Sequence, residues 1–326
     1  MKLRTVLAAL CLLLVQQPAS AAFSRLNVLG DSLSDVGRFF VAMKLASFGT
    51  LSLPNTPYLP GHFSNGPVWV EWYRAAHPEI EVESLAMGGA FSGPVGQVDN
   101  TADILLGGLP LIGPLVQLAA SGLNTQLTYV QDVSGTDTAF ALWIGANDIQ
   151  NAQTLGFAAP ADIVPVSLLY VGNAIDQLLA KGATQVFVAN LPDLGRTPDA
   201  AAGGNAAGLT AATLAFNAGI DALAAGRGPQ VRVVDIYSAF NVLMASAAAI
   251  GLDTTTPCVD GLFDTTACSD PNSHVFWDGV HPTTLVHALV AQVFDAAFTA
   301  PVPLPASGLM VLPGLALLAL RRRQAA

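Results

Sequence analysis

The sequence predicts an α/β domain in which helices cover both faces of a parallel sheet of five strands. Two observations predict this fold class. Short β-rich apolar runs alternate with longer stretches of helical character along the chain. Most of the short runs are also largely apolar, which is typical of strands that are buried on both faces, as in a parallel sheet between two helical layers.

The expected elements follow one another in a regular order. Five short runs are expected to form strands, at residues 25–29, 80–85, 138–144, 184–189 and 231–236. Five longer stretches are expected to form helices, at residues 68–76, 115–131, 163–181, 209–225 and 283–298. Their alternation predicts a three-layer α/β/α sandwich, and a ligand site is expected where the parallel strands end.

The first 21 residues have the layout of a secretory signal peptide. A basic start with Lys2 and Arg4 precedes an apolar stretch at 6–15, and residues 19–21, Ala-Ser-Ala, have the small-x-small pattern of a cleavage site. We therefore expect an exported protein whose folded domain is residues 22–300.

Residues 301–326 form a second terminal segment. A Pro-rich lead precedes an apolar run at 308–320 and a cluster of three arginines at 321–323. The run is shorter than the ~20 residues of a full membrane span. The segment resembles the PEP-CTERM class of sorting signals of Gram-negative bacteria, in its Val-Pro-Leu-Pro-Ala form. The resemblance implies transient membrane contact and cleavage by a protease of the exosortase type, with an ordinary weak membrane anchor as the alternative.

The folded domain is strongly acidic. The whole chain has 13 Lys and Arg, 23 Asp and Glu and a net charge of −10, but five of the cations lie in the two terminal segments and all of the acidic residues lie between them. The domain therefore carries a charge of −15. Such a surface repels phosphate backbones, which argues against nucleic-acid binding.

The domain contains two cysteines, Cys258 and Cys268, because Cys11 lies in the signal peptide. They bracket a short loop rich in Asp and Thr in a chain that we expect to be exported. We expect them to form one disulfide.

Two polar strings follow expected strands, and a third stands near the end of the chain. They are Gly30-Asp31-Ser32-Leu33-Ser34-Asp35, Gly145-Ala146-Asn147-Asp148 and Asp278-Gly279-Val280-His281-Pro282. Each by itself could be a turn or a helix cap. Their order and their positions at strand ends indicate a catalytic site.

These strings resemble those of the GDSL family of SGNH hydrolases, and the resemblance extends from residue 27 to about residue 298. Further matches are Ala86-Met87-Gly88-Gly89-Ala90, the Phe-Ser-Asn-Gly-Pro string at 63–67, and Phe276-Trp277 before Asp278. They are similar to the secreted lipase branch of the family and imply its flavodoxin-like fold. Two departures are His62, where Arg is usual, and Ser84, where Asn is common.

The resemblance implies a serine hydrolase mechanism. Ser32 would be the nucleophile, His281 the base that takes its proton, and Asp278 the group that orients His281. The backbone N–H groups of Ser32 and Gly89 and the side-chain amide of Asn147 would form the oxyanion hole, with Gly88 as the alternative to Gly89. We expect no cofactor and no metal.

Other enzyme classes fit the sequence less well. It lacks a Gly-x-Ser-x-Gly elbow, a phosphate-binding loop and a His-Glu-x-x-His zinc motif. The histidines at 62, 77, 274 and 287 are expected to be structural or on the surface, and the acidic residues of 253–270 are expected to form a solvated loop.

The sequence thus favours an exported serine ester hydrolase, at the surface of a Gram-negative bacterium or secreted from it, whose substrate is a small-molecule or lipid ester. One alternative is an O-acetyl esterase acting on extracellular polysaccharide. The other is a matrix protein that binds glycans without turnover. The acyl and alcohol groups of the substrate depend on loops whose shape the sequence does not specify.

Overall fold

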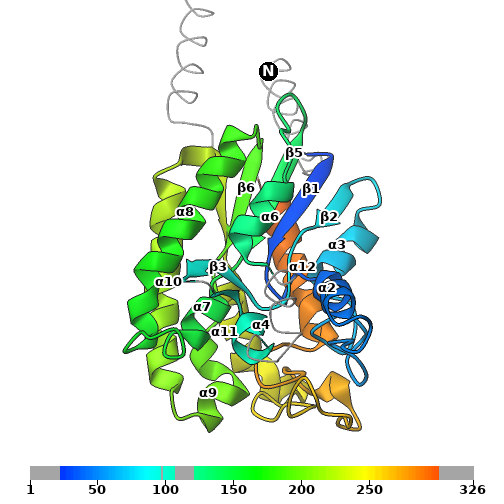
Figure 1. Ribbon diagram of the computed structural model, residues 1–326. Coiled ribbons are helices and arrows are strands. Elements are labelled where there is room, and N and C mark those ends of the chain that lie inside the picture. The colour runs from blue at the N-terminus through cyan, green and yellow to red at the C-terminus, as the bar shows by residue number, and fades with distance from the viewer. Residues whose placement is uncertain (1–22, 97, 107–120, 301–326) are drawn as a thin grey trace, which may run out of the picture. The chain divides into compact units, whose positions relative to one another are not determined.

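The computed structural model describes residues 23–96, 98–106 and 121–300, and its main compact unit is Ala21–Phe298. The expected signal peptide and sorting signal lie outside the described residues. Five parallel strands form the central sheet in the order β2-β1-β5-β6-β7 (Figure 1). Their bounds are Arg25–Gly30 for β1, Glu81–Ser84 for β2, Thr138–Trp143 for β5, Gln185–Ala189 for β6 and Val231–Val234 for β7. All five expected strands are therefore confirmed.

The strand order places a topological switch point between β1 and β5. The chain leaves β1 to form β2 on one side of it and later returns to form β5 on the other side, with Leu26 beside both Val82 and Ala139. This is the flavodoxin-like order, in which ligands bind outside the carboxyl ends of the two central strands. The segments that follow β1 and β5 contain Ser32 and Asn147.

Helices cover both faces of the sheet, which confirms the three layers. One face is covered by α3 (Trp69–Ala76) and α12 (Thr284–Thr299), and the other by α6 (Leu123–Tyr129), α8 (Val164–Ala180) and α10 (Ala206–Ala225) (Figure 1). Segments 160–180 and 206–225 have the length and apolar composition of a membrane span, but in this fold they pack on the sheet and on each other.

Some elements differ from the expected ones. The helix expected at 115–131 is described only from residue 121, and there α6 begins at Leu123. The strand expected to reach 236 ends at Val234, because the Asp235 side chain accepts the N–H of Ser238 and starts α11 (Ile236–Ser246). The segment before the helix expected at 209–225 contains a further helix, α9 (Pro198–Ala202). Elements that were not expected are α2 (Arg38–Ala46), α4 (Thr101–Leu106), α7 (Ala146–Asn151) and the hairpin of β3 (Ala90–Val95) and β4 (Val98–Asn100).

Aromatic packing attaches α12, which follows the Asp278–His281 turn, to the sheet. The Phe294 ring stacks on Trp69 of α3 with centroids 3.7 Å apart and also contacts Trp143 of β5. All three side chains are buried, and each contributes roughly 1.5 to 3 kcal/mol by leaving water. The position of His281 relative to the strand ends therefore depends on this core.

Candidate active site

Ser32 lies in a tight turn directly after β1. The turn is closed by the N–H of Ser34, which donates to the Asp31 carbonyl, and the buried Gln126 side chain binds both backbone groups of Gly30. The Ser32 side chain is buried, and its Oγ lies 2.8 Å from His281 Nε2. A residue just after the first strand and a residue 249 positions later thus meet at the carboxyl end of the sheet.

His281 is held by Asp278 from the same turn. Its Nδ1 lies 2.7 Å from Asp278 Oδ2, and Asp278 Oδ1 accepts the backbone N–H groups of Val280 and His281. An N–H must point from Nδ1 to the carboxylate, which leaves Nε2 free to accept the proton of Ser32. The order Ser32, His281, Asp278 is that of a nucleophile, a base and an orienting group.

Asp278 and His281 shift each other's pKa. Burial alone lowers the pKa of His281, but the negative charge and the hydrogen bond of Asp278 outweigh it and raise this pKa above its usual value. Burial likewise works to raise the pKa of Asp278, and the opposite charge of His281 with the hydrogen bonds to Asp278 lowers it instead. Asp278 is therefore ionised when His281 gains a proton.

Backbone donors surround the space beside Ser32. The N–H groups of Ser32 and Gly89 have no hydrogen-bond partner among the described residues, whereas the N–H of Gly88 donates to Asp35 Oδ2 at 2.7 Å. Gly89 has a φ of 75°, and a Cβ there would meet Asn100 Oδ1 at 2.7 Å. Only glycine fits this backbone conformation without strain.

Asn147 projects from the start of α7, after Gly145, whose φ of 115° turns the chain out of β5. One N–H of its side-chain amide donates to the Ala90 carbonyl at 3.1 Å, and its Oδ1 accepts the Thr101 hydroxyl at 3.4 Å. The second amide N–H is available to a ligand, and Asn147 lines the same cavity as Ser32.

Buried carboxylates that were not predicted as site residues hold this backbone in place. Asp35 accepts the N–H groups of Gly37, Arg38 and Phe39 at the start of α2 in addition to that of Gly88. Asp148 accepts the hydroxyl groups of Ser92 and Ser167. Both residues belong to the motif strings, so the strings themselves were the signal that could have identified them.

Tyr58 is a further residue that the sequence analysis missed. It is 2% exposed, and its hydroxyl donates to Asp278 Oδ2 at 2.8 Å, although the two residues are 220 positions apart. A single sequence carries no local signal for such a contact.

A cavity of about 640 Å³ opens beside Ser32 and His281. Its lining includes mostly apolar side chains around the polar site, among them Leu53, Phe63, Leu194, Ile236, Phe240, Leu262, Phe263 and Phe276. The site therefore adjoins a space that suits an apolar group of a ligand.

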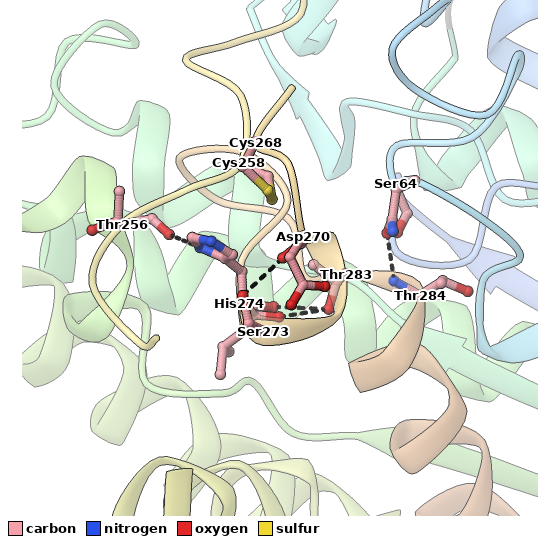
Figure 2. The surroundings of a disulfide bond; sticks show 11 residues. Ser64, Thr256, Cys258, Cys268, Asp270, Ser273, His274, Thr283 and Thr284 are labelled. Carbon is pink, nitrogen blue, oxygen red and sulfur yellow. Dashed lines mark hydrogen bonds between the residues drawn. A yellow bond between two sulfur atoms is a disulfide. The ribbon is translucent and has the colours of Figure 1, made fainter. Parts of the chain in front are cut away.

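The expected disulfide between Cys258 and Cys268 is present (Figure 2). Its loop is attached to the segment before Asp278, because the N–H of Val259 donates to the Trp277 carbonyl at 2.8 Å. His274 lies close to the two sulfurs, with its Nδ1 2.8 Å from the Thr256 carbonyl. The two sulfur atoms are bonded to each other. Cys258, Cys268 and His274 are therefore a disulfide with a neighbouring histidine.

His62, the departure from the family pattern, forms an ion pair. Its Nε2 lies 2.9 Å from Glu71 Oε2, and its Nδ1 contacts the Pro60 carbonyl. Burial alone lowers the pKa of His62, but the hydrogen bond and charge of Glu71 outweigh it, so this pKa is raised. The pKa of Glu71 is lowered. Burial alone would raise this pKa, but the contacts with His62 outweigh the effect of burial. The pair links the loop that contains Tyr58 and Phe63 to α3.

We expect this ion pair to make stability depend on pH. A raised pKa in the folded state stabilises the fold below the unfolded value of about 6.5, and the contribution is lost as pH rises through the folded pKa. The His62→Arg variant keeps its charge, so the wild type should lose about 1 kcal/mol relative to it above pH 7. Urea unfolding at pH 5.5 and pH 8.5 measures this difference. It should disappear in a Glu71→Gln background, and a difference that persists there would contradict the assignment.

Three comparisons with known proteins show what this chain is similar to. The family model described as GDSL-like Lipase/Acylhydrolase matches residues 26–294. Phosphatidylcholine-sterol acyltransferase of Aeromonas hydrophila is 26% identical over 319 residues, which cover 83% of this chain and 89% of that protein. Thermolabile hemolysin of Vibrio parahaemolyticus is 28% identical over 82% of this chain, but the match spans only 62% of the hemolysin. Among solved structures, LAE5, an alpha/beta hydrolase enzyme from the metagenome of Lake Arreo, is 14% identical, with 86% of this chain and 98% of that chain covered and a TM-score of 0.48.

Proposed function

The chain belongs to the GDSL-like lipase/acylhydrolase family and is an ester hydrolase, and from this premise we propose that it is an exported serine hydrolase that works through an acyl-enzyme intermediate. The observation that carries the proposal is the continuous contact from Ser32 through His281 to Asp278, beside which the N–H groups of Ser32 and Gly89 have no partner in the described part of the chain.

In the first step His281 Nε2 takes the Ser32 proton while Oγ forms a bond to the carbonyl carbon of the ester. A serine hydroxyl is a poor nucleophile until a base removes this proton. The imidazolium that forms is stabilised by the Asp278 carboxylate. The proton then passes to the alcohol oxygen as the ester bond breaks, and the acyl group remains on Ser32.

In the second step water replaces the alcohol. His281 takes a proton from water, the hydroxide oxygen bonds to the acyl carbon, and the bond to Ser32 Oγ breaks as the proton returns to the serine. The acid leaves, and the site is restored without a cofactor.

Both steps place negative charge on the former carbonyl oxygen. We assign the N–H groups of Ser32 and Gly89 and the amide of Asn147 as its donors. Gly89 is preferred to Gly88, because the Gly88 N–H is already bound to the Asp35 carboxylate.

The cavity supports a proposal for the substrate class. An acetyl group would leave most of a largely apolar space of about 640 Å³ unfilled, whereas a longer acyl chain would bury apolar surface there. The acyltransferase relative is named for phosphatidylcholine, which is a lipid ester. We therefore favour a carboxylic ester with a medium or long acyl chain over an acetylated polysaccharide.

Two measurements test the proposal. A fluorophosphonate probe should label the protein covalently, whereas a glycan-binding matrix protein without turnover would stay unlabelled. A panel of p-nitrophenyl esters of increasing chain length, beside acetylated sugars and phospholipid vesicles, should show higher kcat/KM for chains longer than acetyl. Highest activity on acetylated sugars would favour the polysaccharide esterase instead.

We also propose export by the segment 1–21 and processing of the segment 301–326 by a protease of the exosortase type. The apolar run at 308–320 is too short for a comfortable permanent span, which favours a temporary membrane contact. Intact-mass measurement of protein from its native host should find the three C-terminal arginines removed. Recovery of the full C-terminus from envelope material would favour a plain anchor.

A further inference from the structure

We propose that Tyr58 is a positioning residue of the reaction, which holds the Asp278 carboxylate in the orientation and ionisation state that His281 needs. The inference rests on the proposed function of Ser32, His281 and Asp278, and adds a fourth side chain to their hydrogen-bonded array.

The hydrogen bonds around Asp278 leave Tyr58 a distinct place. Oδ1 accepts the backbone N–H groups of Val280 and His281, at 2.9 and 2.7 Å. Oδ2 accepts His281 Nδ1–H at 2.7 Å and the Tyr58 hydroxyl at 2.8 Å. Of the donors that the described residues offer to the carboxylate, the turn supplies all but one, and Tyr58 supplies that one from a distant loop.

The packing around Tyr58 fixes its hydroxyl. Its ring meets Trp277, the neighbour of Asp278, edge to face with centroids 5.7 Å apart. The two rings share a small buried cluster with Cys258 and Val259, against which Leu262 and Cys268 pack. The disulfide loop thus encloses the tyrosine ring, and little freedom remains for the hydroxyl to turn away from Asp278.

Burial and the nearby negative charges keep the Tyr58 hydroxyl protonated, and therefore a hydrogen-bond donor, at every working pH. Burial, followed by the negative charge of Asp278 and its hydrogen bond and by the charges of Asp264 and Asp199, raises the pKa of Tyr58 far above its usual value. The phenol stays protonated. It can therefore donate to the carboxylate in the resting enzyme and while His281 carries a proton.

This donor affects the base through the carboxylate. A hydrogen bond to Oδ2 disperses negative charge that would otherwise act on His281 alone, and it prevents rotation of the carboxylate away from Nδ1. Its removal should leave a less well oriented base with a higher pKa. The other titratable groups that act on His281 are Asp31, Asp199 and the neutral, buried His287, and a change at Tyr58 alters none of them directly.

The test is Tyr58→Phe, which keeps the ring and its contact with Trp277. We expect kcat on one p-nitrophenyl ester to fall roughly 5- to 10-fold with KM little changed, because a single hydrogen bond to a charged group is lost. We also expect the acid limb of the kcat/KM profile to move to higher pH by about half a unit, because His281 must be neutral to act as the base. A purely structural role would lower stability without moving this limb.

Tyr73→Phe is the matched control. Tyr73 is buried to the same degree, 1% exposed, and its hydroxyl has no hydrogen-bond partner among the described residues. It should change neither kcat nor the acid limb. A Tyr58→Phe enzyme with wild-type kcat and an unmoved limb overturns the inference, whereas a wild type that neither turns over esters nor reacts with a fluorophosphonate overturns the proposed function itself.

Discussion

The Ser32→Ala variant is expected to lose covalent labelling and essentially all ester hydrolysis while it remains folded. The Oγ atom that His281 Nε2 contacts at 2.8 Å is the atom to which the acyl group would be attached. No acyl-enzyme can form without it, and loss of the nucleophile in serine hydrolases costs roughly 10⁶-fold in kcat. The backbone N–H of residue 32 remains, so binding of the ester should persist.

The measurement is kcat with the best ester of the panel, together with fluorophosphonate labelling, after circular dichroism has shown that the variant is folded. Ser246→Ala is a suitable control, because that hydroxyl is hydrogen-bonded to carbonyl groups of its own helix. The control should retain labelling and turnover. More than a trace of wild-type activity in Ser32→Ala would show that the nucleophile is wrongly assigned.

The Asn147→Ala variant is expected to lose roughly 10²- to 10³-fold in kcat, equivalent to about 3 to 4 kcal/mol of transition-state stabilisation. Its side-chain amide would donate to an oxygen that becomes negative only during the reaction. KM should therefore change little. The variant should still be labelled by the probe, though more slowly, because Ser32 and His281 are intact.

The control for this variant is Asn241→Ala, on α11, where the side-chain oxygen accepts a hydrogen bond from Arg196. It should leave kcat unchanged. A drop in kcat of less than threefold in Asn147→Ala would remove the amide from the oxyanion hole and leave the two backbone N–H groups as its donors.

Much of the fold could be predicted because its signals are local. Most strands of the sheet are short, largely apolar runs, with the edge strand β2 as the exception, and such a run is readable without knowledge of its neighbours. The helices α2 and α11 were missed because their local signals are obscured. Exposed apolar residues such as Val41 and Leu45 hide the amphipathic period of α2, and the apolar start of α11 continues the run of β7.

Part of the candidate site could likewise be predicted from local signals in the sequence. Ser32, Asn147 and the pair of Asp278 and His281 stand in short strings, so their chemical types and their places at strand ends could be read in one dimension. The sequence also sufficed to predict the disulfide, since Cys258 and Cys268 are the two cysteines between the terminal segments.

The remaining features needed the folded chain. Asp35 accepts the Gly88 N–H, whereas that of Gly89 has no partner among the residues that the structure describes, and Tyr58 reaches Asp278 across 220 positions of sequence. His62 replaces the usual Arg by pairing with Glu71. These contacts join segments through single hydrogen bonds in a buried space. Their partners are set by the packing of the loops on the sheet, and such contacts leave no periodic or compositional trace along the chain.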